Sequence, residues 1–262
     1  MPATDDLSGE LALIREAARE AGRIAMRYFG KTPDVWMKTG QSPVSEADIA
    51  VDKFLKGELL TARPDHGWLS EETVADTSRL SARRTFVVDP IDGTRAFIGG
   101  QNTWCVSIAI VENGRPIAGV LDAPAKDEIF EATQGGPALK DGQPIAVRKP
   151  GGLPIVAGPK SMTSTLLPGI GETVKVPYIP SLAYRIAMVA EGEIDATFVT
   201  PNAHDWDLAA ADLILERAGG AVLTPKGVPP VYAASVSRHG SLVAGSGELL
   251  RRMADEAGRQ NW

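Results

Sequence analysis

A short apolar strand that runs into a rigid acidic turn is the feature that most restricts the fold of this chain. Thr85-Phe86-Val87-Val88 is a β-branched and aromatic run, typical of a buried strand. Asp89-Pro90-Ile91-Asp92-Gly93-Thr94 follows it directly. Pro90 fixes its own φ and holds Asp89 extended, while Gly93 permits a positive φ or a close backbone approach. Two carboxylates are thereby placed at the rim of a sheet.

These two carboxylates predict a bound cation. Desolvated acids close together repel each other, so one must take up a proton or both must share a cation. Hard oxygen ligands on a tight turn suit Mg²⁺, which keeps some waters and takes further oxygens from a substrate phosphate. If a helix begins near Thr94, its free N–H groups can also bind an anion. Residues 89–94 therefore predict a site for a metal and a phosphate.

Two further acidic positions are candidates for the same site. Glu71-Glu72 follows the short strand 67–70, whose apolar residues indicate a buried edge. Asp207 lies in the first turn of an apolar helix, and the alanines at 209–211 allow other backbone to come very close to it. Taken singly, Glu71, Asp92 and Asp207 are each also explained as surface or capping residues.

The size and composition of the chain restrict its function classes. At 262 residues, it is long enough for one large domain or two joined subdomains. A net charge of −6 argues against unspecific binding to nucleic acid or membranes. Neither a membrane span nor a signal peptide is expected, and the single cysteine, Cys105, fits a reducing cytoplasm and a core position. The histidines His66, His204 and His239 are too scattered for a zinc cluster.

The first half of the chain is expected to be α+β. Apolar residues recur at helical spacing in two segments, and the second is capped by Ser45 and contains Asp48 at a normally solvated position. The expected core stripe of that second helix is Ile49, Val51, Phe54, Leu55 and Leu59. Helices are predicted over 7–29 and 46–60, and strands over 35–38, 67–70, 85–88, 104–111, 116–121 and 128–132, with a hairpin turn at 112–115.

The second half is expected to be an α/β layer, because strands and helices alternate there. Strands are predicted over 154–157, 174–179, 195–199, 221–223 and 241–244, and helices over 161–167, 182–191, 207–218 and 247–257. Pro150-Gly151-Gly152 is the predicted boundary. An α+β subdomain over 1–150 would contain the antiparallel meander and most candidate metal ligands, and an α/β subdomain over 151–262 would supply Asp207.

Taken together, the motifs resemble the inositol monophosphatase superfamily of Mg²⁺-dependent, Li⁺-sensitive phosphatases. The resemblance spans residues 10–257 and rests on Glu71-Glu72, the hexapeptide 89–94 and Trp206-Asp207-Leu208-Ala209-Ala210, in that order. It extends to 44–48 and 189–195. It implies a layered αβαβα sandwich of the inositol monophosphatase/fructose-1,6-bisphosphatase type, two or three Mg²⁺ ions, a small phosphorylated metabolite as substrate and a homodimer.

The resemblance also implies roles for single residues. Glu71, Asp89 and the Ile91 carbonyl would hold one Mg²⁺, and Asp89, Asp92 and Asp207 a second, with a weaker third ion near Glu71. Thr94, paired with Asp48, would help to activate the attacking water, and the Gly93 and Thr94 N–H groups would hold the phosphate. The catalytic set is then Glu71, Thr94 and Asp48, and the substrate-binding set is Asp92, Gly93, Thr94 and Asp207.

Several positions depart from the family pattern or extend it. Ser70 and Ala211 stand where glycine is usual, and both changes leave the ligands intact. Thr200 stands where members specific for inositol phosphates often have an acid, which argues against strict inositol specificity. With Arg95 directly after the motif, the chain resembles histidinol-phosphatase-like members. Lys38, Lys160 and Arg185 could hold a second phosphate, although each is also explained as an ordinary surface charge.

The expected function is the Mg²⁺-dependent hydrolysis of a small phosphomonoester by a metal-activated water, of the inositol-1-phosphate type or with broad specificity. Within the same class, the alternatives are a 3′(2′),5′-bisphosphate nucleotidase and a histidinol phosphatase. From another class, the alternative is a non-catalytic partner of RNA-processing or transcription machinery, as some bacterial relatives are. The intact ligand set favours catalysis.

Overall fold

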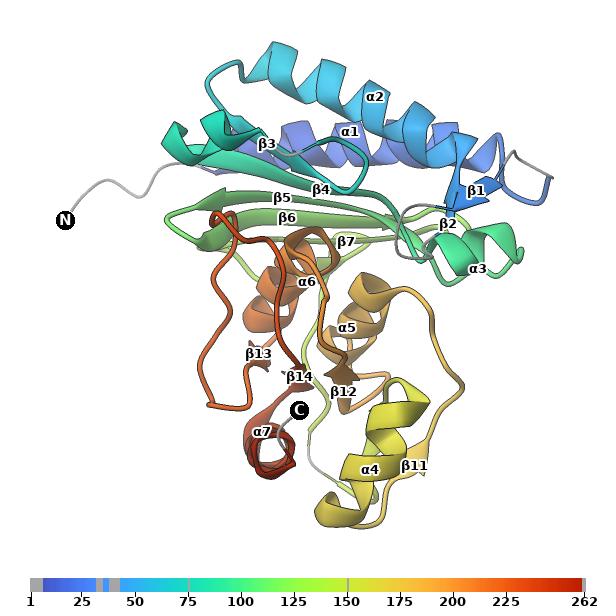
Figure 1. The fold of residues 1–262 in the computed structure, drawn as a ribbon, viewed down its shortest axis with the longest axis vertical. Coiled ribbons are helices and arrows are strands. Elements are labelled where there is room, and N and C mark those ends of the chain that lie inside the picture. Colours follow the sequence, from blue (N-terminus) through green and yellow to red (C-terminus); the bar gives the residue numbers. More distant parts are fainter. Residues whose placement is uncertain (1–6, 32–34, 38–42, 75, 150, 261–262) are drawn as a thin grey trace.

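The molecule is built in five layers, helices on sheet on helices on sheet on helices (Figure 1). The computed structural model describes residues 7–31, 35–37, 43–74, 76–149 and 151–260. The layers confirm the predicted αβαβα sandwich. No helix in these described ranges is long and apolar enough to cross a membrane. The predicted division at 150–152 stays a prediction.

The first sheet has seven strands in the order β3-β4-β5-β6-β7-β8-β9. Only β3 and β4 are parallel, and the other neighbours are antiparallel, as expected for a meander. At the turn between β5 and β6, Asn113 and Gly114 both have positive φ, which confirms the predicted hairpin. The strands are β3 (Gly67–Ser70), β4 (Arg84–Asp92), β5 (Cys105–Glu112), β6 (Arg115–Ala123), β7 (Glu128–Thr133), β8 (Leu139–Lys140) and β9 (Gln143–Pro144).

The second sheet has the order β11-β10-β12-β14-β13 and is mixed, because β14 runs antiparallel to both of its neighbours. Its strands are β10 (Ile155–Ala157), β11 (Val174–Lys175), β12 (Ala196–Val199), β13 (Ala221–Leu223) and β14 (Leu242–Gly245). The strand predicted over 174–179 therefore ends at Lys175. Pro177 and Pro180 follow, and a proline cannot donate a ladder hydrogen bond.

Helices fill the other three layers. The outer layer on the first sheet is α1 (Ser8–Met26) and α2 (Glu46–Ala62), and the middle layer is α5 (Leu182–Ala190) and α6 (Asp205–Arg217). The far layer is α4 (Lys160–Ile170) and α7 (Gly247–Arg259). Three short elements complete the order: the two-stranded ladder β1 (Val35–Met37) with β2 (Pro43–Ser45), the 3₁₀ helix η1 (Thr77–Ser81) and α3 (Thr94–Ile98).

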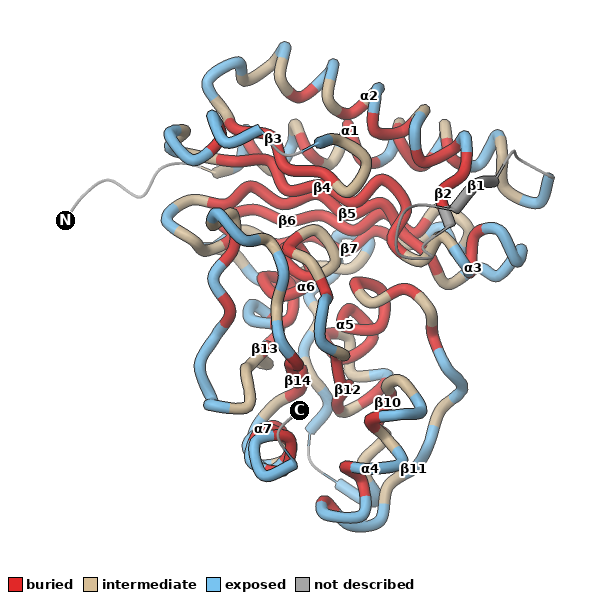
Figure 2. Tube along the Cα trace, viewed as in Figure 1, coloured by how far each residue is buried: buried red, intermediate tan, exposed pale blue. Residues whose placement is uncertain are grey.

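The helices of the middle layer are buried over most of their length (Figure 2). The three alanines 209–211 are fully buried there, and Cys105 is buried in the same core. A Cβ added to Gly119 of β6 would lie 3.0 Å from the Ala210 Cα atom, so strand and helix backbones approach closely. This confirms the prediction that the alanines admit neighbouring backbone, and it brings the start of α6 against the first sheet.

The prediction for α2 is wrong at two residues. Ile49 is 42% exposed, whereas Val51, Leu55 and Leu59 are fully buried. At 100° per residue, these three form one stripe, and Ile49 lies about 120° from the middle of it. Asp48, predicted to be solvated, is buried because it faces the same side as the stripe.

Candidate metal and phosphate site

Three carboxylates meet where β4 ends and α6 begins. Asp89 and Asp92 come from the last residues of β4, where the pairing with β5 is irregular between them. Asp207 comes from the first turn of α6, more than a hundred residues later. One oxygen from each carboxylate lies within 4.8 Å of the other two. This is the arrangement of acids that the sequence predicted from separate motifs.

The group lies in a cleft of about 330 Å³ between the two halves of the chain. The lining includes Arg95 and Thr200, and also Tyr178 and Arg185, which belong to the segment before α5 and to α5. Of the predicted site residues, only Asp48 does not line the cleft. The others all do: Glu71, Asp89, Ile91, Asp92, Gly93, Thr94 and Asp207. A larger cavity of about 430 Å³, between α1 and the β6–β7 turn, contains none of them.

Asp89 is the most enclosed of the three acids, with 1% of its surface exposed. One carboxylate oxygen accepts a hydrogen bond of 3.0 Å from the Ile91 N–H, which fixes the side chain within its own turn. Burial raises the pKa of Asp89 well above its usual range, and the neighbouring charges of Glu71 and Asp92 raise it further. The ionised form therefore needs a positive partner.

Asp92 lies at the beginning of α5 and receives its hydrogen bonds from there. The Ser181 hydroxyl and the Ala183 N–H both donate to Oδ2, and the Leu182 N–H donates to Oδ1. Burial raises the pKa of Asp92 to about 6, although these hydrogen bonds act in the opposite direction. Asp92 is thus oriented by a helix start from the second half of the chain.

Sequence reasoning missed Ser181. Its only signal is that it precedes a predicted helix, which is typical of an N-cap, and it does accept a 3.1 Å hydrogen bond from the Tyr184 N–H. Gly93 has φ of +90°, and a Cβ added there would lie 2.8 Å from the Ser181 Cβ atom. The glycine therefore lets the acidic turn and the start of α5 come together, as its predicted role in close approach requires.

Asp207 is the third residue of α6 and caps the helix. Its Oδ2 atom accepts a 2.7 Å hydrogen bond from the His204 N–H, and the His204 ring stacks on Trp206 with centroids 4.4 Å apart. Burial, followed by the charge of Asp92, raises the pKa of Asp207 well above its usual range. The cap holds one carboxylate oxygen in the turn and leaves the other for the cluster.

Glu71 lies beside this group but is not one of its three members in the described ranges. Its N–H donates to the Val88 carbonyl, which continues the β3–β4 ladder by one residue and puts Glu71 next to Asp89. Asp52 of α2 supports the same turn, since it accepts hydrogen bonds from the hydroxyls of Ser70 and Thr73. The serine that departs from the family pattern therefore anchors the Glu71 turn.

Asp48, in the first turn of α2, lies close to Thr94, at the start of α3. The Ser45 N–H and hydroxyl both donate to Asp48 Oδ2, as in a capping box, and this explains why the acid is buried and not solvated. The Thr94 hydroxyl lies 3.4 Å from Asp48 Oδ1 and 3.2 Å from the Ile91 carbonyl oxygen. Helix α3 begins at Thr94, as predicted.

Two of the three basic residues considered for a second phosphate, Lys160 and Arg185, can be compared with the cleft. Lys38 lies outside the described residues. Lys160 is exposed on α4 and does not line the cleft. Arg185 was interpreted as a possible surface charge, and this is wrong, because only 3% of it is exposed. Its guanidinium donates to the Thr197 hydroxyl and to the carbonyls of Ile179 and Phe198.

The donor set fits a hard divalent cation. Asp89, Asp92 and Asp207 offer carboxylate oxygens, and within the described part of the chain no ion pair joins any of them to a Lys or Arg side chain. Burial raises the pKa of all three, and the charges of neighbouring acids raise the pKa of Asp89 and Asp207 further. An oxygen-binding ion such as Mg²⁺ would relieve that repulsion.

Fold and site together define a hydrolase class that works with a divalent cation. Residues 6–259 match the model of the inositol monophosphatase family. The chain belongs to this family, whose members are Mg²⁺-dependent phosphatases of small phosphorylated substrates.

Individual relatives agree with this assignment. The chain is 32% identical to the inositol-1-monophosphatase of Mesorhizobium japonicum, over 94% of each protein. It is 31% identical to the fructose-1,6-bisphosphatase/inositol-1-monophosphatase of Thermotoga maritima, over 78% of this chain and 80% of that protein. The crystal structure of the extragenic suppressor protein suhB from Bartonella henselae superposes with a TM-score of 0.84 at 28% identity, covering 95% of this chain and 98% of the other.

Proposed function

We propose that the protein hydrolyses small phosphomonoesters in a Mg²⁺-dependent reaction, of the inositol-1-phosphate type or with a broader range of leaving alcohols. The observation that carries this proposal is a group of three carboxylates, two buried and one half-buried, in a cleft that also contains the Gly93–Thr94 turn. Among the described residues, none of the three forms an ion pair with a Lys or Arg side chain. Thr200, where an acid would bind ring hydroxyls, lines the same cleft and favours the broader range.

The carboxylates are proposed to share two ions. Glu71, Asp89 and the Ile91 carbonyl would hold the first, and Asp89, Asp92 and Asp207 the second, with a weaker third ion near Glu71. The proximity of the three aspartates and the position of Glu71 beside Asp89 support this division. When bound, Mg²⁺ supplies Lewis-acid chemistry, since it lowers the pKa of an attacking water and draws charge from phosphoryl oxygens.

Asp48 and Thr94 are proposed to take the proton of that water. Asp48 Oδ2 accepts both hydrogen bonds from Ser45, and Oδ1 lies 3.4 Å from the Thr94 hydroxyl. A proton that leaves the water reaches Thr94 Oγ1, whose own proton passes to Asp48 Oδ1. The new bond is from the water oxygen to phosphorus, and the ester P–O bond breaks. The alkoxide that leaves takes up a proton from solvent, and Asp48 returns its proton to solvent after the product has left. The backbone N–H groups of Gly93 and Thr94 are proposed to hold the phosphate.

The bisphosphate nucleotidase alternative has less support. The Arg185 guanidinium donates hydrogen bonds to the Thr197 hydroxyl and the Ile179 carbonyl, and Lys160 does not line the cleft. Arg95 does line the cleft, so histidinol phosphate and bisphosphates belong among the substrates to be compared.

The test is a phosphate-release screen with Mg²⁺ over inositol-1-phosphate, histidinol phosphate, fructose-1,6-bisphosphate and 3′-phosphoadenosine 5′-phosphate. We expect turnover of at least one monoester, and inhibition by millimolar Li⁺. Asp207→Asn should abolish turnover, whereas the matched variant Asp212→Asn, on the same helix but outside the cleft, should retain it. Full activity of Asp207→Asn would refute the metal assignment.

The alternative of another class, a non-catalytic partner of RNA-processing or transcription machinery, is separated from catalysis by Asp92→Asn. Binding to such a partner should survive this change, while phosphate release should not. We also propose a cytoplasmic homodimer. The buried free thiol of Cys105 supports the reducing compartment, and sedimentation of the purified protein would test the dimer.

A further inference from the structure

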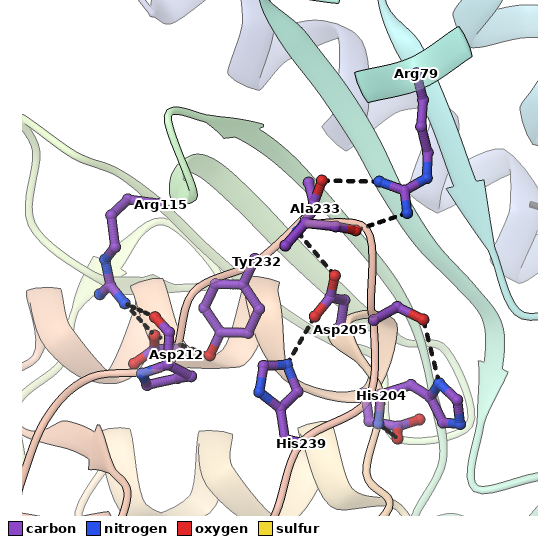
Figure 3. A network of polar contacts seen from close by, with 12 residues as sticks. Arg79, Arg115, His204, Asp205, Asp212, Tyr232, Ala233 and His239 are labelled. Atoms are coloured by element: carbon purple, nitrogen blue, oxygen red, sulfur yellow. Dashed lines mark hydrogen bonds and ion pairs between the residues drawn. The ribbon is translucent and has the colours of Figure 1, made fainter. Parts of the chain in front are cut away.

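Asp205, two residues before Asp207, is a buried carboxylate outside the three-carboxylate group. It is the first residue of α6 and has no exposed surface. Oδ2 accepts a 2.8 Å hydrogen bond from the Ala233 N–H, and Oδ1 lies 2.7 Å from His239 Nε2, which donates to it (Figure 3). Both donors belong to residues 232–239, part of the long connection between β13 and β14 that runs beside α6 (Figure 1).

The backbone of the same segment also holds the residues that lead into α6. The Asp205 N–H donates to the Ser237 carbonyl at 2.8 Å, and the His239 N–H donates to the Ala203 carbonyl at 2.8 Å. The Asn202 N–H donates to the His239 carbonyl at 2.9 Å. The turn that places Asp207 is therefore paired along its length with the 232–239 segment and pinned at Asp205.

Arg79 connects the segment to the other side of the cleft. Its guanidinium donates to the carbonyls of Ala233 and Ala234 at 2.8 and 2.7 Å (Figure 3). Arg79 is 5% exposed and lies in η1, which packs so closely on β3 that a Cβ added to Gly67 would lie 3.0 Å from the Arg79 Cα atom. Strand β3 leads directly to Glu71. The turns of Glu71 and Asp207 thus share one support.

Ala233, at the centre of this support, has an unusual backbone. Its φ is +55°, in the left-handed region that residues with a Cβ rarely adopt. Both of its backbone groups are held, the N–H by Asp205 and the carbonyl by Arg79. Such a conformation persists only where the surroundings determine it, which indicates that the segment is held in one position.

We propose that Asp205 is a positioning residue, which acts with Ala233, His239 and Arg79 to place the Asp207 carboxylate for metal binding. The inference rests on the proposed role of Asp207 in holding Mg²⁺. The path is short, because Asp205 fixes the first residue of the turn in which the His204 N–H orients Asp207. Residues that orient a metal ligand from outside the coordination sphere commonly affect metal affinity, which falls when they are replaced.

Asp212 provides a matched control on the same helix and the same segment. It is 1% exposed, accepts a 3.0 Å hydrogen bond from the Tyr232 hydroxyl and lies 3.1 Å from Arg115. Asp205 and Asp212 are therefore both buried acids bonded to the 232–239 segment (Figure 3), but Asp205 is two residues from Asp207 and Asp212 is five residues from it. A purely structural role would affect both variants alike.

The experiment is calorimetric titration of the full chain with Mg²⁺, with a thermal melt of each variant. Asp205→Ala should weaken Mg²⁺ binding by about tenfold or more, and Asp205→Asn, which keeps one acceptor for the Ala233 N–H, should recover part of that loss. Asp212→Ala should lower the melting temperature and leave Mg²⁺ binding unchanged. Turnover of Asp205→Ala should return towards the wild-type rate at saturating Mg²⁺.

A second variant covers the case in which Asp205→Ala does not fold. His239→Ala removes one of the two donors and should weaken Mg²⁺ binding in the same direction by a smaller factor. Wild-type binding in both His239→Ala and the Asp205 variants would overturn the positioning role alone. A wild-type chain that binds no Mg²⁺ would instead overturn the proposed function, and this inference with it.

Discussion

Helix α6 carries acids in two regions, and the neighbours of their negative charge differ between the two. Asp212 lies about 7.5 Å further along the helix than Asp207. Burial raises the pKa of Asp212 to about 6, and the neighbouring Arg115 guanidinium and the Tyr232 hydroxyl act against that rise. Asp207 instead lies in one group with Asp89 and Asp92, and burial, followed by the charge of Asp92, raises its pKa. No lysine or arginine among the described residues forms an ion pair with this second group.

The difference separates a structural acid from one that is suited to a ligand. A buried carboxylate that already has a guanidinium partner contributes to the fold and offers little to an external cation. A group of carboxylates left without such a partner is destabilising when ionised, until a cation from solution joins it. Asp212 is buried and Asp207 is half-buried, and burial raises the pKa of both. The partners distinguish them, and four predictions test that distinction.

The largest effect is expected from Asp89→Asn. The amide oxygen can still accept the hydrogen bond from the Ile91 N–H, but one charged ligand is lost, so phosphate release should fall by about 100-fold or more. Without Mg²⁺, the variant should be more stable than the wild type, because a repulsive buried charge has gone. Phosphate release and urea unfolding in EDTA check the two halves. A stability loss in EDTA would contradict the comparison.

Ser181→Ala should have the next largest effect on activity. The change removes the hydroxyl that donates to Asp92, so this carboxylate should be less well oriented and the Mg²⁺ requirement should rise by about tenfold. The measurement is phosphate release as a function of Mg²⁺ concentration. Ser164→Ala, which removes an exposed hydroxyl bonded only within α4, is the control and should behave as the wild type.

Mg²⁺ itself should stabilise the fold through the cleft acids. At about 100 times its dissociation constant, linkage gives about 2.7 kcal/mol and a rise in melting temperature of about 5 °C or more. Asp89→Asn should lose most of this rise. Asp212→Asn should keep all of it, although it should cost about 2 kcal/mol of stability, since its Arg115 partner is 32% exposed and partly screened. Calorimetric melts with and without Mg²⁺ measure both.

The smallest effect is expected at Asp122, a buried acid outside both regions. Asp122 is 7% exposed. No hydrogen bond or ion pair joins its carboxylate to another described residue, although Arg19 and Arg23 line the same cavity. Burial raises the pKa of Asp122 from 3.8 to about 7. Between these two values the folded state binds more protons than the unfolded state, so stability falls as pH rises through this window.

Asp122→Asn removes that dependence. The variant should match the wild type below about pH 4, gain on it between about pH 4 and 7, and keep a constant advantage above about pH 7. Urea unfolding at several pH values, in EDTA so that the cleft is the same in both proteins, measures the difference. An advantage that shrinks with rising pH would show that the carboxylate is stabilised by Arg19 and Arg23.

Sequence reasoning recovered the elements and the residues that local rules govern. The hairpin at 112–115, the start of α3 at Thr94 and the cap at Ser45 follow from turn and capping chemistry within a few residues. The grouping of Glu71, Asp89, Asp92 and Asp207 came from the family resemblance, since local rules marked each acid only as a candidate for the site.

The errors have two causes. Ile49 and Asp48 were assigned to the wrong sides of α2, although the helical period itself places Asp48 with Val51, Leu55 and Leu59. Arg185 and Ser181 look like ordinary surface or capping residues in sequence. Whether a polar side chain is buried depends on partners far away in the chain, such as Thr197 and Ile179 for Arg185, or Asp92 for Ser181. Local periodicity carries no information on those partners.

The motifs in the sequence carry a family resemblance, and that resemblance implied the family, the layered fold and the acids that meet at the end of β4. Strand and helix periods and turn residues predicted the separate elements. Which acids are balanced by a cationic side chain, as at Asp212, and which are left for an ion, as at Asp207, became visible only in three dimensions. Coulombic balance depends on distances in space, and the 232–239 segment brings Asp205 and Asp212 their partners from far along the chain.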